Sequence, residues 1–588
     1  MKDRILITTP LKSTWPIDGE PVLFLGEWCK LFSQQHLLLN MDYKVVPYHW
    51  DDRKKLNQDF FYLIDLYEVI LQELSEKLNL IHDVNHSLRY WRILVGPWLL
   101  VFIPLLYDRW ESLQKASSSF SISKTSVLDY ANLESIAFDM SHFEHLMKTD
   151  HWNHFIYSSI LNKTKLIKTS NVKKIPPEEF IPSRVKPSNS QSSRELILKI
   201  IKGLSNLLSG NNNIFIIDSY LSKIDLLKLQ LKLFQFPALY SSPEIEQTNP
   251  EMKTRDWSLP TSKGESSFEI FVREFIPIQI PAVYLEGYEK LNAKSNTMPW
   301  PSNPKLIWSS NTWYAEEVFK IWSAKKAELG VPLVAGQHGG VYGTGLFSMP
   351  ADHELKICDY FLSWGSKKWD SSKNNNKIIP IGIFKKYKKR IEKTSVLMIS
   401  SDLCRYSNSL VSLPMSTQCL EAFDNEFTFI SLLPDYILND LVVRPFKYEY
   451  GWSYHDRLKD RFPKIKIDAG EDRLENLFLR SKISISTWNA TTYLETLSLN
   501  IPTMIFWDPE HSEVKKSAEK YFDILKKVGI FHDNPESAAN HLIKIWGDID
   551  GWWESSEVMS AKDIFIDRYA NNKDLLGKLT RALQESAN

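Results

Sequence analysis

The sequence predicts an α/β protein in which two parallel-sheet domains face a cleft, with a helical insertion in the first domain. The chain has 588 residues, and a single hydrophobic core rarely serves more than about 250–300 residues. Short apolar runs rich in β-branched residues alternate with helical stretches, which is typical of parallel sheets covered by helices. A lysine-rich stretch at 385–393 separates two such series and is the expected linker.

The first series opens with short strands and then changes character. We expect these strands at Ile5–Thr8, Val22–Leu25 and Lys44–Val46. From about residue 60 to residue 150 a helical insertion is predicted, because apolar residues recur at spacings of three and four, as in Leu63, Leu66, Ile70, Leu74 and Leu78. Residues 165–195 are rich in Lys, Pro and Ser, and are predicted to be a surface loop or a partly disordered linker.

Strands return after this loop and continue into the second series. The first domain, residues 1–384, is expected to hold further strands at Ile214–Ile217, Lys305–Ser309, Pro332–Ala335, Tyr360–Ser363 and Ile378–Ile381. The second domain, residues 395–560, is expected to hold strands at Ser395–Ile399, Thr428–Leu432, Leu441–Val443, Lys464–Ile467, Ile483–Ser486 and Thr503–Phe506. Residues 561–588 are predicted to form a helical tail.

Composition argues against several classes of protein. Lys plus Arg and Asp plus Glu number 71 each, so the chain has no net positive charge to attract nucleic acid. Nucleic acid is therefore not expected as a partner. The four cysteines form no C-x-x-C pair, which predicts neither a zinc site nor a disulfide framework. The most apolar stretch, Ile93–Leu106, is shorter than the about 20 residues that span a bilayer. It is expected to be a buried helix pair, with a membrane-surface patch as the alternative.

The densest glycine signal follows the expected strand Pro332–Ala335. It runs from Gly336 to Gly345, and its candidate donor-binding residues are Gln337, Gly339 and Gly340, with His338 between them. Glycines at the carboxyl end of a parallel strand let backbone N–H groups approach a phosphate or a sugar closely. His338 is a candidate acid or base, or a hydrogen-bond donor to a developing charge. The spacing is not the dinucleotide pattern G-x-G-x-x-G, so NAD is not expected. A turn that merely closes the strand is the alternative.

A second signal is Arg444, which leaves the end of the expected strand Leu441–Val443. A guanidinium group binds a phosphate through two parallel hydrogen bonds. Arg444 is therefore a candidate donor-binding residue, with a surface ion pair as the alternative.

The third signal is a polar turn that follows Ile483–Ser486 and leads into a helix. Ser, Thr and Asn at a helix start cap its free N–H groups, and the same N-terminus attracts anions. A nucleotide phosphate or a sugar carboxylate is therefore expected here, with simple capping as the alternative. The candidate donor-binding residues of this segment are Ser486, Thr487, Asn489, Thr491, Thr492 and Glu495.

Several chemistries have no motif in the sequence. No D-x-D stands at a strand end, and no H-E-x-x-H motif or Cys/His cluster occurs, so no metal is expected at the site. The sequence also lacks G-x-x-x-x-G-K-[ST], which argues against an ATPase or GTPase, and G-x-S-x-G, which argues against a serine hydrolase. No cofactor is predicted.

Five segments resemble a family of transferases encoded in bacterial O-antigen and capsule gene clusters. They are LITTPLKSTWP, FLGEWC, WRILVGPWL with YDRW, AGQHGGVYGTG and STWNATTYLETLSLNIPTMIFWD. The likeness covers nearly the whole chain. The Gln-His-Gly segment is also similar to that of capsule transferases that use CMP-activated acidic sugars. The Ser-Thr turn with its Glu-bearing helix resembles the donor site of GT-B glycosyltransferases.

The resemblance implies a GT-B-like fold of two Rossmann-like domains. The nucleotide-sugar donor would bind in the C-terminal domain and the acceptor in the N-terminal one. The match departs from the CMP-sugar enzymes at one place. They commonly carry a His-Pro motif in the donor domain, where Arg444 and Pro445 stand here, and this puts a CMP donor in doubt.

The expected function is that of a metal-independent glycosyltransferase. It would move a sugar from a nucleotide-activated donor, a CMP-linked acidic sugar being one candidate, to a surface polysaccharide or lipopolysaccharide. Glu27, in FLGEWC, is the first candidate base and His338 the second, while a structural role is the alternative for Glu27. A nucleotide-sugar epimerase or hydrolase on the same fold and a non-catalytic component of a polysaccharide export complex are the alternative functions.

The expected partners are a nucleotide sugar and a polysaccharide or lipid-linked glycan. The expected location is the cytoplasm, with peripheral contact with the inner membrane as an option.

Overall fold

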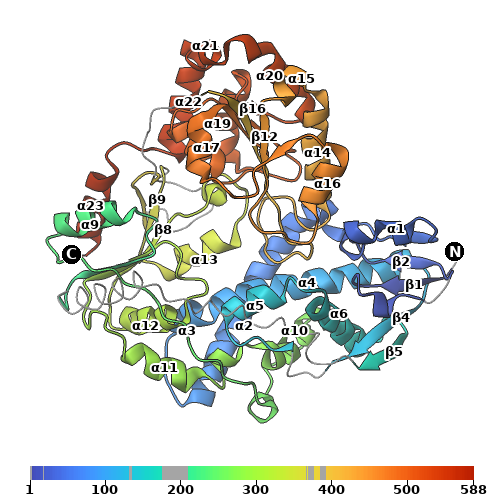
Figure 1. The fold of residues 1–588 in the computed structure, drawn as a ribbon. Coiled ribbons are helices and arrows are strands. Elements are labelled where there is room, and N and C mark those ends of the chain that lie inside the picture. Colours follow the sequence, from blue (N-terminus) through green and yellow to red (C-terminus); the bar gives the residue numbers. More distant parts are fainter. Residues whose placement is uncertain are drawn as a thin grey trace, which may run out of the picture.

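The computed structural model describes residues 3–16, 19–130, 135–174, 210–365, 367, 377–384 and 393–587. Their strands form three sheets in which each pair of neighbouring strands is parallel, with helices around them (Figure 1). The α/β class predicted from the sequence is therefore confirmed. The number of sheets differs, because the part of the chain predicted as one N-terminal domain holds two of them.

The first sheet contains β1 (Arg4–Ile7), β2 (Val22–Phe24), β3 (Tyr43–Val45), β4 (Ile122–Asp129) and β5 (Thr169–Lys174). They lie in the order β3-β2-β1-β4-β5. β1, β2 and β3 coincide with predicted strands. The segments predicted to be helical and loop-like contain β4 and β5 instead, and those two predictions are wrong there. The physical reason is strand pairing, because β4 lies between β1 and β5. These neighbouring strands stabilise β4 as a strand although its local sequence periodicity does not predict one.

Between β3 and β4 the chain forms α2 (Arg53–His82), α3 (Leu88–Leu94) and α4 (Gly96–Ser119). Asp52 caps α2, because its side chain accepts hydrogen bonds from the backbone N–H groups of Lys54 and Lys55. The shorter α1 (Gln35–Leu38) precedes these helices, and α5 (Met140–Leu146) and α6 (Asp150–Thr164) follow β4. The predicted helical insertion is thus largely present, although β4 interrupts it.

The apolar stretch Ile93–Leu106 lies in α3 and α4 and is buried, with Trp98 and Phe102 at 0% exposure. This is the buried helix pair expected from the sequence. Within the described ranges, no single helix is long and apolar enough to cross a membrane. By length and composition, α3 and α4 pass that test together as a pair bent by 70°.

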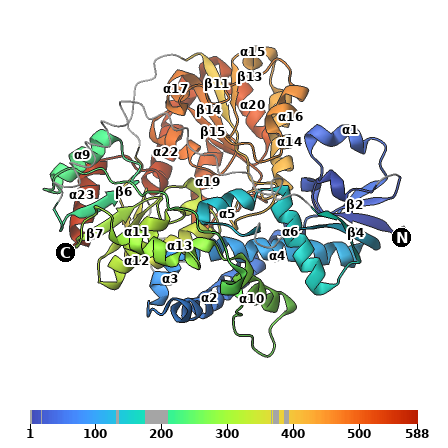
Figure 2. The same ribbon diagram turned by 60° about the horizontal axis from the view of Figure 1, so that its bottom comes forward.

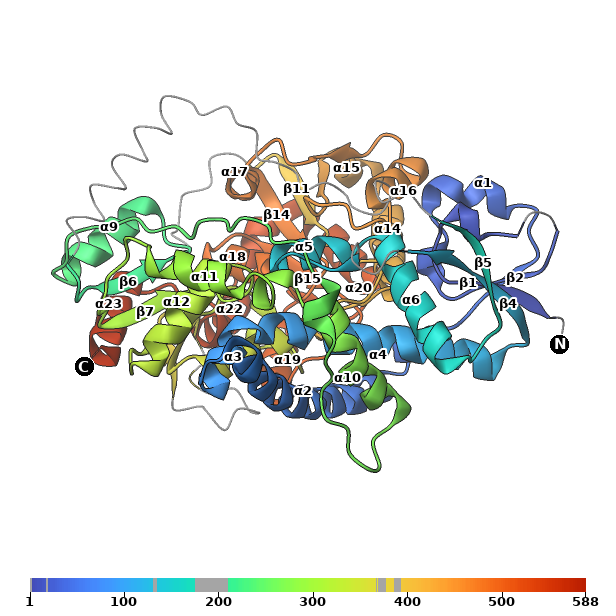
Figure 3. The same ribbon diagram turned by 90° about the horizontal axis from the view of Figure 1, so that it is seen from below.

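The middle sheet contains β6 (Ile214–Ile217), β7 (Leu306–Ser309), β8 (Leu333–Gly336), β9 (Tyr360–Ser363) and β10 (Ile378–Pro380), which neighbour one another in chain order. Its helices are α9 (Lys223–Lys232), α10 (Ser267–Gln279), α11 (Tyr288–Asn296), α12 (Glu317–Glu328) and α13 (Met349–Ile357). α3 packs against α12 and α4 packs against α10 (Figure 3). α4 also packs against α13. The helical insertion therefore connects the first and middle sheets.

The third sheet contains β11 (Ser395–Ile399), β12 (Leu441–Arg444), β13 (Lys466–Ile467), β14 (Ser481–Ser486), β15 (Thr503–Phe506) and β16 (Phe531–His532). Their order is β13-β12-β11-β14-β15-β16. The chain thus builds outward from β11 in one direction, then returns to continue from β14 in the other. This reversal between β11 and β14 is the arrangement of doubly wound nucleotide-binding sheets.

The helices of the third part are α14 (Gln418–Leu432), α15 (Asp435–Leu438), α16 (Tyr454–Arg461), α17 (Leu474–Arg480), α18 (Thr492–Ser498), α19 (Lys516–Lys527) and α20 (Pro535–Ile545). The strand predicted at Thr428–Leu432 is wrong, because these residues end α14. The buried residues of α14 recur at helical spacing, as Cys419, Phe423, Phe427 and Ile430 show. Thr428–Leu432 alone, a short window with Phe and Ile, resembles a buried strand, and only the earlier helical turns of α14 show its helical periodicity.

The chain ends with α21 (Ile549–Trp553), α22 (Ser556–Tyr569) and α23 (Leu575–Ser586). Leu579 and Leu583 of α23 are buried with Ile216 of β6 and Leu229 of α9, and Figure 2 shows α23 beside α9. The helical tail therefore returns from the third sheet to the middle one. Most of the predicted linker at 385–393 lies outside the described residues.

Candidate functional site

The point where the third sheet reverses is framed by the ends of β11 and β14. Ser400 follows β11, and Thr487 follows β14. Ligands of open α/β sheets bind in the crevice outside the carboxyl ends of the strands at such a reversal. Sequence reasoning identified Thr487 as a candidate but not Ser400.

The carboxylate of Glu426, on α14, joins these two strand ends. Its Oε1 accepts hydrogen bonds from Ser400 Oγ at 2.9 Å, Thr487 Oγ1 at 2.5 Å and Trp488 Nε1 at 3.2 Å. Its Oε2 accepts a hydrogen bond from Tyr454 OH at 2.6 Å. The four donors fix the edge of the crevice before any ligand arrives.

Glu426 is 1% exposed. Burial raises the pKa of Glu426, although the hydrogen bonds it accepts act in the opposite direction. Sequence reasoning missed this residue. An acid between Phe423 and Phe427, on the buried face of an apolar helix, is the signal that could have found it, because an ionisable group on such a face needs a specific reason.

The glycine-rich loop after β8 contacts the polar turn after β14. Gly340 N donates a hydrogen bond to Thr491 Oγ1 at 3.1 Å, and Thr344 Oγ1 donates to Asn489 Oδ1 at 3.3 Å. The carboxyl edges of the middle and third sheets therefore meet at the two motifs that the sequence singled out.

The glycines of this loop make room for protein rather than for a free ligand. A Cβ on Gly340 would lie 2.3 Å from the carbonyl oxygen of Ala490, and one on Gly339 would lie 3.0 Å from the ring of Tyr342. Gln337 is engaged as well: its Nε2 donates to Gly339 O at 3.0 Å, and its Oε1 accepts from Trp364 N at 2.9 Å. Close approach of two loops thus explains why Gly340 is glycine.

His338 lies in a hydrogen-bonded group with Glu354 of α13 and Tyr342. Its Nε2 is 2.7 Å from Glu354 Oε1 and 2.5 Å from Tyr342 OH. Burial lowers the pKa of His338, but the negative charge of Glu354 and the hydrogen bond that Glu354 accepts from the ring outweigh burial, so the net pKa is raised. The ring therefore stays charged to a higher pH than an ordinary histidine. Sequence reasoning selected His338 without its two partners.

The polar side chains of the turn after β14 form contacts other than the predicted capping of the following helix, α18. Thr491 stands at the N-cap of α18 but makes no side-chain cap hydrogen bond. Ser486 Oγ and Thr492 Oγ1 lie 3.4 Å apart, and Glu495 lies in the first turn of α18. Asn489 is buried, and its Nδ2 has no hydrogen-bond partner among the residues the structure describes. That amide is the clearest donor for a ligand at this edge.

Two further sequence candidates, Arg444 and Glu27, are paired with other protein groups. Arg444 forms an ion pair with Asp468 and donates to Asp472 O at 3.2 Å. Its strand, β12, is separated from β14 by β11. Glu27 follows β2 and its Oε2 pairs with Lys30 Nζ at 2.8 Å. The structure thus gives each of these side chains a protein partner and does not bring either of them to His338.

Asp402, in the segment after β11, is a further acid that sequence reasoning missed. It is 4% exposed, its Oδ2 accepts a hydrogen bond from Tyr450 N at 3.3 Å, and its Oδ1 has no partner in the described ranges. Burial, and then repulsion from Glu449, raise the pKa of Asp402 to about 8. A group of three or more His, Cys, Asp or Glu side chains suited to a metal ion does not occur among the described residues.

Comparison with known proteins gives one match over nearly the full length. A family model described as LIC12162 family transferase matches residues 4–583. No curated protein matches the chain.

Solved structures give more distant likenesses. MurG from Acinetobacter baumannii is 8% identical, with 64% of this chain and 99% of MurG covered and a TM-score of 0.32. HepE from Anabaena, in complex with UDP and glucose, is 10% identical, with 64% and 99% covered and a TM-score of 0.34. A UDP-N-acetylglucosamine 2-epimerase is 10% identical, with 64% and 95% covered and a TM-score of 0.31.

Proposed function

Because the chain belongs to the LIC12162 family of transferases, we propose that it is a glycosyltransferase of the GT-B type. In this proposal it moves a sugar from a nucleotide-activated donor to a surface polysaccharide or lipopolysaccharide. The observation that carries the proposal is the meeting of two parallel-sheet edges at Gly340 and Thr491, beside the strand reversal closed by Glu426. A transferase needs such a meeting point, where a donor on one sheet faces an acceptor on the other.

The donor is proposed to bind at the reversal between β11 and β14. The buried amide of Asn489 offers a hydrogen-bond donor to the phosphates. His338, held by Glu354, lies in the loop whose Gly340 contacts Thr491, and it is proposed to offer a positive charge to the same phosphates. When the sugar–phosphate bond breaks, negative charge develops on the departing phosphate, and a fixed imidazolium stabilises it.

The acceptor hydroxyl attacks the anomeric carbon and must lose its proton to a base. Glu27 was the first candidate from sequence, but its ion pair with Lys30 gives it a competing partner. A charged His338 is a poor base. Donor contact is therefore the role proposed for His338.

The test is a thermal-shift panel of nucleotides and nucleotide sugars, followed by product analysis. A ligand at 100 times its dissociation constant stabilises the fold by about 2.7 kcal/mol. The nucleotide with the largest thermal shift therefore identifies the nucleobase of the donor. A transferase needs an acceptor for turnover, an epimerase yields an isomeric nucleotide sugar without one, and an export scaffold binds no nucleotide. Turnover is expected to persist in EDTA, and restoration by manganese after its loss would contradict metal independence.

The proposed location is the cytoplasmic face of the inner membrane, with α9 as the contact. Phe234, two residues after the end of α9, is 93% exposed and has a positive φ of 56°. The exposed face of this segment combines apolar and basic side chains, namely Ile224, Leu227, Leu231 and Phe236 with Lys223, Lys228 and Lys232. An apolar helix face bordered by lysines suits an anionic membrane surface.

A further inference from the structure

One acid of α5, Glu144, is half-buried but has no protein partner. Its carboxylate makes neither a hydrogen bond nor an ion pair with the residues that the structure describes. Neither oxygen is among the fully enclosed polar atoms that lack a partner, so both keep surface that a substrate can reach. Lys148 follows four residues later, a spacing that in a helix places two side chains on the same face.

Lys148 brings this face of α5 to the third sheet. Its Nζ lies over the ring of Tyr450, 5.3 Å from the ring centroid. The backbone N–H of Tyr450 donates a hydrogen bond to Asp402 Oδ2 at 3.3 Å. Asp402 stands two residues after Ser400, which lies at the strand reversal where the donor is proposed to bind. The open face of α5 therefore lies beside the carboxyl edge of the third sheet.

The middle sheet contributes Tyr314, in the segment that follows β7. Burial raises the pKa of Tyr314, and the negative charge of Glu144 raises it further. Burial, then Cys404 and then Glu144 likewise raise the pKa of Tyr450. The interaction between two charges weakens with distance, so Glu144 lies near both rings. One carboxylate therefore faces the middle sheet and the third sheet together.

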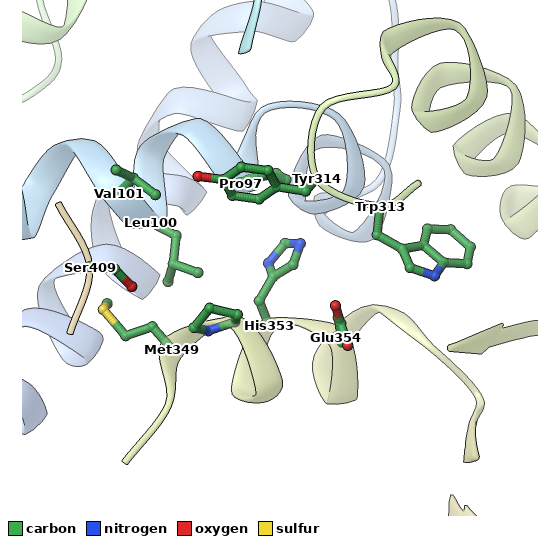
Figure 4. A pocket seen from close by; sticks show the side chains of 10 residues that line it. Pro97, Leu100, Val101, Trp313, Tyr314, Met349, His353, Glu354 and Ser409 are labelled. Carbon is green, nitrogen blue, oxygen red and sulfur yellow. The ribbon is translucent and has the colours of Figure 1, made fainter. Parts of the chain in front are cut away.

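A cavity of about 100 Å³ lies beside Tyr314 (Figure 4). Its lining combines Tyr314 with Leu100 of α4 and with Ser409 of the segment after β11. Glu354, which holds His338, lines the same cavity. The cavity thus connects the surroundings of Glu144 with those of the histidine that is proposed to contact the donor.

The charges around Glu144 suit a base. Burial raises the pKa of Glu144 and the positive charge of Lys148 lowers it in part, so the net pKa is raised. A carboxylate with a raised pKa accepts a proton more readily than an ordinary one. The two candidates from sequence are less suitable, because the raised pKa of His338 keeps it charged and Glu27 is paired with Lys30.

We propose that Glu144 is the general base of the transfer reaction. This inference rests on the proposed glycosyltransferase function. The oxygen of an acceptor hydroxyl forms a bond to the anomeric carbon of the donor sugar, and its proton passes to a carboxylate oxygen of Glu144. The bond from that carbon to the phosphate oxygen breaks, and its electron pair leaves with the nucleotide phosphate. Glu144 then releases the proton to water. A direct displacement of this kind inverts the configuration at the anomeric carbon.

Glu144→Gln tests the assignment, because it keeps the shape of the side chain and removes its capacity to accept a proton. The assay follows nucleotide release from the nucleotide sugar with the largest thermal shift, in water alone and with added methyl hexopyranosides. Release is expected to fall about 10²–10⁴-fold, while nucleotide affinity and the urea unfolding midpoint stay unchanged. Glu554→Gln, the same substitution at the exposed C-cap of α21, is the matched control. Release from Glu144→Gln at the rate of the unmodified enzyme overturns the proposal.

The dependence of turnover on pH identifies the group that accepts the proton. A base must be ionised, so turnover rises with pH through its pKa. A rise that Glu144→Gln abolishes comes from Glu144 and not from His338. A rise that persists in Glu144→Gln comes from another base and counts against the proposal.

Azide distinguishes a base from a residue that only positions the substrate. The azide ion carries no proton, so its attack on the donor sugar needs no base. Azide is therefore expected to restore nucleotide release in Glu144→Gln and to give a glycosyl azide of inverted configuration, as measured by NMR. No restoration by azide, or a product of retained configuration, overturns the assignment of Glu144. Absence of nucleotide-sugar binding in the unmodified chain would instead overturn the proposed function.

Discussion

The backbone N–H of Gly340 donates a hydrogen bond to Thr491 Oγ1 at 3.1 Å, across 151 positions of sequence. Gly340 follows a strand of the middle sheet, and Thr491 follows a strand of the third. At the same contact, a Cβ on Gly340 would meet the carbonyl oxygen of Ala490. The two sheets are therefore held edge to edge by a contact that tolerates no side chain at position 340.

Gly340→Ala is expected to separate the two loops. The added Cβ would lie 2.3 Å from a backbone atom, and overpacking of this kind destabilises a protein by about 1–3 kcal/mol. Urea denaturation measures the change in the free energy of unfolding, and nucleotide-sugar turnover should fall with it. Gly547→Ala is the control, because a Cβ there meets nothing within 4 Å. Equal unfolding midpoints for the two variants would show that the contact is unimportant.

The charge of His338 is expected to make donor binding depend on pH. The imidazolium is present below the raised pKa of His338 and is lost as pH rises through it, so affinity for a nucleotide sugar should fall over that range. Glu354→Gln removes the cause of the shift, and the loss of affinity should begin at lower pH. Calorimetry between pH 5 and 9 measures both curves.

His338→Gln separates the two roles considered for this histidine. Contact with the donor predicts weaker binding and a mild loss of turnover, whereas a base role predicts a loss of roughly 10²–10⁴-fold in turnover with binding kept. We expect the first result. His455→Gln on the exposed face of α16 is the control. Turnover that rises with pH in the unmodified enzyme would favour the base role.

Asp402 is expected to reduce stability as the pH rises. Its pKa in the folded chain is about 8, against about 3.9 in an unfolded chain. Between these values the folded protein holds a proton that the unfolded chain has lost, so raising the pH favours unfolding. Asp402→Asn should therefore stabilise the protein more at pH 8 than at pH 5, as measured by urea denaturation. The same gain at both pH values, or in Asp456→Asn on the exposed face of α16, would contradict this assignment.

Arg444→Ala is expected to affect stability more than donor binding. The change leaves Asp468 without its ion-pair partner, and a hydrogen bond to a charged group contributes about 1.5–3 kcal/mol. The free energy of unfolding should fall by that order, with nucleotide affinity retained. Arg444→Lys should recover part of the loss, because an ammonium lacks the planar fork. A ten-fold drop in nucleotide affinity without loss of stability would instead indicate that Arg444 binds the donor.

Removal of the exposed Phe234 ring that follows α9 is expected to weaken binding of the protein to anionic membranes. Burial of one large apolar side chain is worth about 1.5–3 kcal/mol, so Phe234→Ser should weaken co-sedimentation with phosphatidylglycerol vesicles roughly ten-fold. Leu39→Ser and Leu80→Ser remove other highly exposed apolar side chains, 81% and 79% exposed, and serve as controls. Equal binding to neutral phosphatidylcholine vesicles, or no binding to either, would rule out this contact.

The sequence alone located most strands of the middle and third sheets. β7, β8 and β15 are short, mainly apolar runs closed by turn residues, because parallel strands are buried on both faces. It also located the two loops that meet, since glycine and hydroxyl residues at strand ends are a local pattern. The family resemblance and the transferase class came from the same segments.

The tertiary structure decided what local patterns do not encode. β4 is a strand because β1 and β5 pair with it, and Thr428–Leu432 is helical because it continues α14. The partners of His338, and the carboxylate of Glu426 beneath the strand reversal, are set by which elements pack together. Periodicity along the sequence indicates which face of a helix or strand is buried. The partner of a side chain depends instead on contacts between segments far apart in the chain. The sequence could therefore indicate candidate site residues, whereas their hydrogen-bond partners became visible only in the folded structure.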